Sequence, residues 1–225
     1  MTRKMVAVPV VILCVAIAWV VRWQVPDGMA KEQKAPSGMI ALGTKAPEFH
    51  LPDVVTGRMI SLETFANKRA LLVMTLCRSC PYVQHVKREV ARLARDYAEE
   101  SLGIVAISSN DVASYPQDTP ASLKEMAQQE GFAFPFCYDE AQEVGRAYTA
   151  VCTPDFLLFD QDRRLVYRGQ LDDSRPGNGK PLTGHDLRAA IDAVLAGQPV
   201  NPNQKRSTGC SIKWKSGHEP AYLKR

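Results

Sequence analysis

Short apolar runs alternate along this chain with longer segments whose apolar residues follow a helical period. The runs at 70–76 and 103–108 are rich in Leu, Val and Ile, which predicts two buried strands. Between these runs, apolar residues recur at spacings of three and four, which predicts an amphipathic helix over 81–101. The residues that set this period are Val83, Val86, Val90, Leu93 and Tyr97.

Capping residues predict a second helix after the second strand. Thr119 is a favourable N-cap residue, and Pro120 suits the first helical position. The helix is expected to run to Glu130, and Gly131 would end it. A further short helix is expected over 139–148.

The pattern of residues 156–197 predicts a hairpin followed by a closing helix. Strands are expected at 156–159 and 165–168, joined by a polar turn. Thr183 is the expected cap of a last helix that stops at Gly197. This order of elements predicts an α/β domain over 43–197, with a central mixed β-sheet flanked by helices. It is the order of a thioredoxin-like fold.

The N-terminal segment has the pattern of a membrane signal. Residues 5–21 carry no charge, Arg3 and Lys4 precede them, and Arg22 follows. The length is near the lower limit for a spanning helix, so 1–22 is predicted to be a signal anchor or transmembrane segment. Basic residues ahead of the run place the domain outside the cytoplasm, on the periplasmic or extracellular side. The alternative is a protein secreted after signal cleavage.

Charge is unevenly spread over the chain. Residues 23–42 combine Pro and Gly with charged residues and are predicted to be a linker. Residues 25–197 hold 19 basic and 23 acidic residues, so no nucleic-acid partner is expected for the domain. The basic C-terminal extension, 198–225, is expected to be solvated, with acidic lipid head groups or RNA as alternative contacts.

Cys77 and Cys80 lie where the first predicted strand becomes a helix. The unpaired N–H groups and partial positive charge of a helix N-terminus favour a thiolate over a thiol. We expect Cys77 to be an exposed catalytic nucleophile and Cys80, which is less accessible, to be the resolving cysteine. Arg78 would add a positive charge beside the thiolate, lower its pKa and make the pair more oxidising.

Other roles for this pair stay open at the level of sequence. The two thiols could form half of a zinc or copper site for metal binding or delivery, completed by Cys152, Cys210 or His85. They could also form an inert disulfide or remain unreactive. The sequence contains no glycine-rich phosphate loop, and no cofactor is expected.

A second motif, Thr153-Pro154, precedes the strand expected at 156–159. In a thioredoxin fold this loop lies against the cysteine pair, so Pro154 is expected to be cis and the loop to bind substrate. Cys152 then becomes a third sulfur near the pair, as a modulating residue or a packed thiol. Cys137 is expected in the core, and the role of Cys210 is undecided.

Several segments in a common order resemble the redoxin superfamily, which includes alkyl hydroperoxide reductase, thiol-specific antioxidant and peroxiredoxin-like proteins. The resemblance implies a thioredoxin-like fold and antioxidant or oxidoreductase activity; the thiols would act on protein thiols and disulfides or on small thiols. The segments, between about residues 43 and 220, are GTKAPEFHLPDVVTGRMISLETF, CPYV, GIVAISSND, CTPDFLLFD, LVYRGQLDDSRPGN and STGCSIKWK.

Two departures from the family pattern bear on the chemistry. Related sequences usually have Asn-His between the cysteines, where this chain has Arg78 and Ser79. Peroxiredoxins carry the pattern PxxxTxxC, and aligning its cysteine with Cys80 puts Cys77 at the threonine and Val73 at the proline. Thiol-dependent peroxidase activity is therefore the alternative to disulfide exchange.

Overall fold

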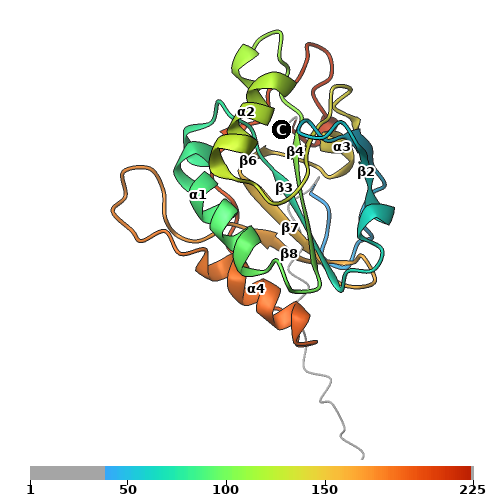
Figure 1. Cartoon of the computed structure of the whole chain (residues 1–225), viewed down its shortest axis with the longest axis vertical. Coiled ribbons are helices and arrows are strands. Elements are labelled where there is room, and N and C mark those ends of the chain that lie inside the picture. The colour runs from blue at the N-terminus through green and yellow to red at the C-terminus, as the bar shows by residue number, and fades with distance from the viewer. Residues whose placement is uncertain (1–38, 224–225) are drawn as a thin grey trace, which may run out of the picture. The chain divides into compact units, whose positions relative to one another are not determined.

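A single five-stranded mixed sheet organises the described part of the chain, residues 39–223 of a computed structural model (Figure 1). The strand order is β5-β4-β3-β7-β8. Neighbouring strands β3, β4 and β5 are parallel, whereas β7 and β8 are antiparallel to their neighbours. The bounds are β3 Ala70–Thr75, β4 Leu102–Ser108, β5 Phe136–Tyr138, β7 Asp155–Phe159 and β8 Leu165–Gly169.

The two faces of this sheet are covered differently. Helices α1 (Pro81–Asp96), α2 (Pro120–Glu130) and α4 (His185–Leu195) supply the buried residues of one face. The other face packs against a small hairpin and two short helical segments. These are β1 (His50–Pro52), β2 (Met59–Ser61), η1 (Leu62–Phe65) and α3 (Glu143–Ala147).

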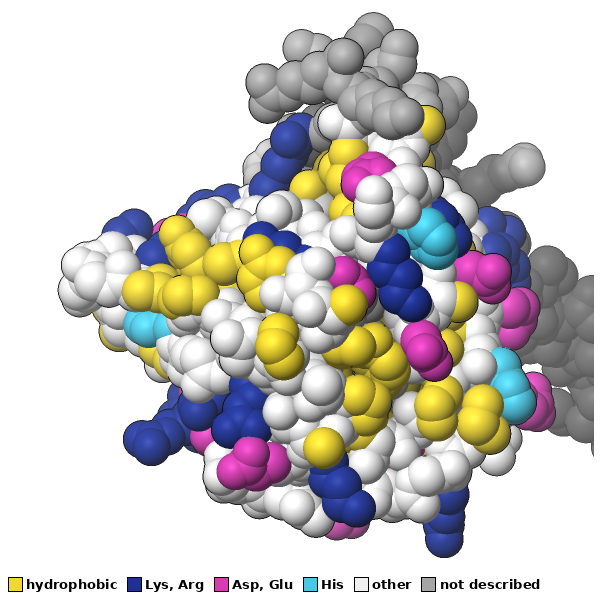
Figure 2. All heavy atoms as spheres, turned by 90° about the horizontal axis from the view of Figure 1, so that it is seen from above, with side chains coloured by type: hydrophobic (Ala, Val, Ile, Leu, Met, Phe, Trp, Pro, Cys, Tyr) yellow, Lys and Arg dark blue, Asp and Glu magenta, His cyan; other side chains and the backbone are white. Residues whose placement is uncertain are grey.

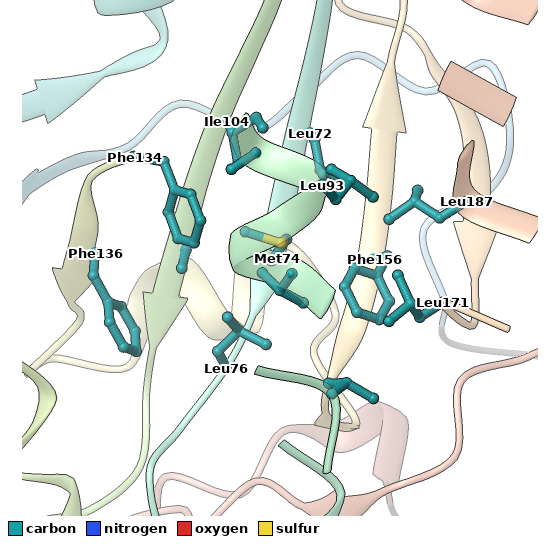
Figure 3. Packing of buried hydrophobic residues seen from close by; sticks show 14 of the residues in the cluster. Leu72, Met74, Leu76, Leu93, Ile104, Phe134, Phe136, Phe156, Leu171 and Leu187 are labelled. Atoms are coloured by element: carbon teal, nitrogen blue, oxygen red, sulfur yellow. The ribbon is translucent and has the colours of Figure 1, made fainter. Parts of the chain in front are cut away.

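Alternation along β3 divides the core between the two faces. Leu72 and Met74 point toward α1 and α4, and Leu93 and Leu187 meet them there (Figure 3). The neighbouring strand residues, such as Leu71, pack on the other face. Successive side chains of a strand point to opposite faces, so a strand buried on both sides is apolar throughout.

The thioredoxin-like α/β arrangement is confirmed, and most predicted elements are present. In α2 the Thr119 hydroxyl accepts a hydrogen bond from the backbone N–H of Ser122 at 3.3 Å, and Gly131 ends the helix with φ of 65°. A glycine is favoured at this end of α2 because it adopts positive φ without a steric penalty. Cys137 lies in β5 and is fully buried, as expected.

Three boundaries differ from the sequence-based expectation. Helix α1 ends at Asp96, and α3 begins only at Glu143. The N-cap of α4 is Gly184 rather than Thr183. The Thr183 hydroxyl accepts instead from the N–H of His185, inside the helix start. Helix ends carry weaker pattern signals than helix interiors, which accounts for these shifts.

The predicted signal anchor at 1–22 and most of the linker at 23–42 lie outside the described residues. Among residues 39–223, no helix is both long and apolar enough to cross a membrane. Membrane attachment therefore stays a prediction from sequence.

The basic C-terminal segment packs on the domain, which corrects the expectation of a solvated extension. Strand β9 (Cys210–Ser211) pairs with β6 (Cys152–Thr153). Ile212 is buried, and the hydroxyl of Tyr222 donates to the carbonyl of Ala150 at 3.0 Å. The segment thus contributes a buried apolar side chain and a paired strand to the domain. Its basic composition did not indicate either contribution.

A buried ion pair ties β8 to the start of β7. Arg168 donates through Nε and Nη2 to one carboxylate oxygen of Asp155, at 3.1 and 2.9 Å. Its guanidinium also donates to the hydroxyl and carbonyl of Thr149, at 2.7 and 2.8 Å. Both charged side chains are only 5% exposed. Removing one partner would leave the other charge buried without compensation.

We expect Arg168→Met to lower the free energy of unfolding by about 3–5 kcal/mol, because Asp155 is left as an isolated buried charge. Urea unfolding followed by circular dichroism measures this loss. The double variant Arg168→Met/Asp155→Leu is the control and should be more stable than the single variant. Equal stability of the two variants would contradict an energetic role for this pair.

Candidate functional site

Cys77 and Cys80 lie at the junction of β3 and α1, as predicted. Cys80 is the N-cap residue of α1, and Pro81 opens the helix. Both cysteines are buried, with 1% and 2% of their surface exposed. The expectation that Cys77 lies at an exposed edge is therefore wrong. A substrate reaches either sulfur only after part of the surrounding structure moves.

The Thr153–Pro154 loop contacts both sulfurs. Its peptide bond is cis, as predicted. The Thr153 hydroxyl lies 3.1 Å from the sulfur of Cys77, and Cys80 in its protonated form donates to the Thr153 carbonyl at 3.1 Å. One residue of this loop therefore holds the pair in place through its side chain and its backbone.

Asp118, at the end of η2 (Pro116–Asp118), binds the loop between the two cysteines through its carboxylate. Its carboxylate accepts the backbone N–H groups of Arg78 and Ser79, at 2.7 and 2.8 Å. It also accepts the Ser79 hydroxyl at 2.7 Å and the side-chain amide of Asn110 at 2.8 Å. Asp118 has no exposed surface. Four donors therefore compensate the burial of this charge.

The guanidinium of Arg78 was expected to place its positive charge beside the thiolate, but it is directed to α2. Its guanidinium donates to the carboxylate of Glu125 at 2.5 Å and to the carbonyl of Ser122 at 2.9 Å, both on α2. The hydrogen bond from Arg78 is also the main cause of a lowered pKa at Glu125. The charge of Arg78 is thus matched by an acidic neighbour on α2.

The C-terminal segment brings a third sulfur to the site, which sequence reasoning left undecided. Cys210 pairs with Thr153 across the β6–β9 ribbon. Cys210 lies close enough to Cys80 for each to shift the pKa of the other. Cys210 itself is half-buried and packs against the core cluster that contains both cysteines of the pair. Strand pairing thus brings a residue 130 positions along the chain from Cys80 into its neighbourhood.

Ionisation within the pair is favoured at Cys80. The neighbouring thiol of Cys77, the thiol of Cys210 and the backbone N–H of Val83 lower the pKa of Cys80 far below that of an ordinary thiol, against the opposing effect of burial. The pKa of Cys77 is raised by its interaction with Cys80, by burial and by the nearby charge of Asp118. The order of ionisation therefore favours Cys80, whereas the catalytic roles of the two cysteines stay a prediction.

The other candidate residues lie around this centre. Cys152 is half-buried beside the carbonyl of Pro154, and burial raises its pKa to about 12. The imidazole Nε2 of His85 lies 2.9 Å from the hydroxyl of Ser174, and His85 lines a small hollow beside Pro154. Throughout 39–223, no three His, Cys, Asp or Glu side chains are grouped as a metal site requires.

Sequence reasoning missed Asp118 and Asn110, and it left the role of Cys210 undecided. Asn110 and Asp118 belong to the GIVAISSND segment and the polar stretch that follows it. A polar cluster just after a buried parallel strand was a usable signal, because such strand ends line sites in α/β folds. For Cys210 no local pattern was available.

We expect Asp118→Ala to lower the free energy of unfolding by about 1–3 kcal/mol for each buried N–H that loses its acceptor. Three N–H groups are affected, those of Arg78, Ser79 and Asn110. Asp118→Asn keeps one acceptor oxygen and is the matched control, with a smaller loss. Urea unfolding of the reduced protein measures both, and equal small losses would contradict this role of Asp118.

Comparison with known proteins places the chain in a family. The Redoxin family profile matches residues 41–185. An uncharacterized conserved protein from Geobacillus kaustophilus is 52% identical, with a TM-score of 0.77 over 79% of this chain and 94% of that one. A hypothetical protein from Sinorhizobium meliloti 1021 is 48% identical, with a TM-score of 0.78 over 79% and 97%.

A curated relative is more distant. Thiol-disulfide oxidoreductase ResA from Bacillus thuringiensis (strain Al Hakam) is 26% identical over 127 residues, which are 56% of this chain and 67% of that protein. The family profile spans well over half of the present chain and includes the cysteine pair and the Thr153–Pro154 loop. The chain therefore belongs to the Redoxin family.

Proposed function

We propose that this protein is a thiol–disulfide oxidoreductase whose redox pair is Cys77 and Cys80. The observation that carries the proposal is the pair of neighbouring sulfurs, both in contact with Thr153, with ionisation favoured at one of them. A stabilised thiolate beside a second thiol is the arrangement that disulfide exchange requires. The relative ResA is itself named a thiol-disulfide oxidoreductase.

The charge distribution favours Cys80 as the attacking sulfur. In this scheme the Cys80 thiolate attacks a substrate disulfide, a mixed disulfide forms, and one substrate thiolate leaves. Cys77 then gives up its proton and attacks the sulfur of Cys80, which releases the second substrate thiolate. The substrate gains two electrons and the proton of Cys77, its other thiolate takes up a proton from water, and the protein gains the Cys77–Cys80 disulfide. This assigns the two cysteines the reverse of their sequence-based roles.

We place the substrate against the Thr153–Pro154 loop. Beside Pro154, a small hollow of about 10 Å³ opens between Tyr82 on α1 and Thr208 in the C-terminal segment. The end of the molecule where β3 leads into α1 is at the top of Figure 1, and Figure 2 looks onto it. Apolar patches lie there among side chains of both charges, which suits a protein or small-molecule disulfide better than a nucleic acid.

Disulfide exchange is preferred over peroxide reduction for a structural reason. Val73, at the position of the peroxiredoxin proline, packs on the face of the sheet opposite the two thiols. The residue that aligns with the peroxiredoxin threonine is Cys77, which offers Cys80 a thiol and not a hydroxyl. The elements that would polarise a peroxide next to Cys80 are thus incomplete.

A redox titration tests the proposed function. The purified protein, equilibrated with glutathione buffers of graded potential, is expected to form a Cys77–Cys80 disulfide in one two-electron transition. Alkylation of the remaining thiols followed by mass spectrometry measures the oxidised fraction. Cys80→Ser should abolish the transition, whereas Cys137→Ser, in the core, is the control and should keep it. A wild-type protein that forms no such disulfide across the series would sink the proposal.

The thiolate of Cys80 gives a pH dependence with a definite sign. Because its pKa in the folded protein lies far below that of an ordinary thiol, the Cys80 thiolate persists at neutral pH and is lost only in acid. The stability that this gives the reduced folded state is complete above the unfolded thiol pKa of about 8.5 and declines as the pH falls from there toward the folded pKa. The ultraviolet absorbance of the thiolate should therefore titrate with an acidic midpoint, far below about 8.5, in the wild type. The signal should vanish in Cys80→Ser and persist in Cys152→Ser; a midpoint near 8.5 would contradict the assignment.

A further inference from the structure

The side chain of Cys210 is directed at the redox pair by strand pairing. Directly opposed residues of an antiparallel ribbon point their side chains to the same face. Thr153 and Cys210 are such a pair, and the Thr153 hydroxyl lies 3.1 Å from Cys77. The carbonyl of the same Thr153 lies 3.1 Å from the sulfur of Cys80, so strand pairing directs the Cys210 thiol toward both cysteines of the pair.

The close approach of the two strands depends on Gly209. A Cβ atom at this position would lie 2.0 Å from the carbonyl oxygen of Thr153 and 2.6 Å from its carbonyl carbon. Both neighbours are backbone atoms of the β6 loop, which cannot move aside as a side chain can. Only glycine permits Cys210 to lie this close to the pair.

Polar side chains of the domain fix the segment just after Cys210. The backbone N–H of Lys213 donates to the side-chain oxygen of Asn110 at 2.9 Å. The carbonyl of Lys213 accepts from the N–H of Asp111 at 2.7 Å and from the side-chain amide of Gln142 at 2.9 Å. These contacts hold the segment at a defined position rather than leaving it to rest on the surface.

We infer that Cys210 is a third redox thiol, which resolves mixed disulfides at Cys80 by forming a Cys80–Cys210 disulfide. The inference rests on the proposed function, since the mixed disulfide at Cys80 is its starting point. Cys80 would then lie between two resolving thiols, Cys77 from its own loop and Cys210 from the C-terminal segment.

The step balances without a further reactant. A substrate disulfide and the Cys80 thiolate first give a mixed disulfide and one substrate thiolate. The Cys210 thiol then loses its proton and attacks the Cys80 sulfur. The Cys80–Cys210 bond forms, the bond from Cys80 to the substrate breaks, and the second substrate thiolate leaves and takes up the proton. The substrate disulfide is reduced by two electrons, and the two protein thiols are oxidised.

The reactivity of Cys210 is coupled to the state of Cys80. Burial and the hydrogen bond and charge of Cys80 raise the pKa of Cys210 to about 11 in the reduced protein, while Lys213 lowers it. When Cys80 enters a mixed disulfide, its negative charge is gone, and that contribution disappears. Cys210 is thereby more readily ionised at the stage at which it must attack.

Cys152 is the natural comparison. It precedes Thr153 in β6, and successive residues of a strand point to opposite faces. Its sulfur lies near the carbonyl of Pro154, at 3.8 Å. Cys152 therefore offers a matched control, a thiol on the same strand that faces away from the pair.

The test uses the full chain, reduced and then incubated with oxidised glutathione, quenched in acid, alkylated and mapped by mass spectrometry. In Cys77→Ser, most of the oxidised Cys80 is expected in a disulfide with Cys210. In Cys77→Ser/Cys210→Ser, the mixed disulfide of Cys80 with glutathione should accumulate several-fold more. Cys77→Ser/Cys152→Ser should behave like Cys77→Ser.

Three outcomes would overturn the inference, the first two as follows. One is an equal accumulation of the glutathione adduct with and without Cys210, and the other is a Cys80 that stays unmodified in Cys77→Ser. In both cases the Cys77–Cys80 disulfide of the wild type decides separately whether the proposed function stands. A Cys80–Cys152 disulfide in Cys77→Ser would also overturn it.

Two further measurements do not depend on the folding of the cysteine variants. The oxidised wild type is expected to contain the Cys80–Cys210 disulfide beside Cys77–Cys80, and a digest with only the latter counts against the inference. Gly209→Ala should push β9 away from Thr153 and reduce the Cys80–Cys210 fraction several-fold. An unchanged fraction in Gly209→Ala would show that the strand pairing does not direct this bond.

Discussion

The arrangement of the site depends on the buried carboxylate of Asp118. This charge has no contact with solvent and is compensated by donors from the loop between the cysteines and from Asn110. A buried carboxylate is tolerated only where its acceptors are filled, so the loop is held in one conformation. The same negative charge disfavours ionisation of Cys77. One group therefore fixes the loop and adds to the effects of Cys80 and of burial that keep Cys77 protonated.

The C-terminal segment is connected to that carboxylate through a single side chain. Asn110 donates to Asp118 with its amide nitrogen and accepts the backbone N–H of Lys213 with its oxygen. The Thr153–Pro154 loop closes the site from the opposite side and pairs with Cys210. Parts of the chain that are far apart in sequence thus meet around the sulfurs through backbone pairing and a few amides. The buried network is satisfied throughout, which favours one defined geometry.

Local sequence patterns predicted the fold and the centre of the site. The period of the apolar residues in α1, the caps of α2 and the cis bond at Pro154 are encoded by neighbouring residues, and each was read from them. The roles of Arg78 and Cys210 depend on distant residues instead. Arg78 turns to Glu125, and Cys210 lies in a strand of two residues that has no periodic signal of its own. Such contacts follow from tertiary packing, which a single sequence does not display.

The pairing of β9 with β6 determines when, during synthesis and folding, the redox pair becomes enclosed. About 130 residues separate Cys80 from Cys210, so at ~5–20 residues per second the ribosome adds Cys210 roughly 10 s after Cys80. Closing a loop of that length also costs entropy that local contacts do not. During this interval the two sulfurs lack a covering strand and are open to any thiol or disulfide in the compartment where the chain folds. The reactive pair is thus among the earlier parts to be synthesised and among the later ones to be enclosed.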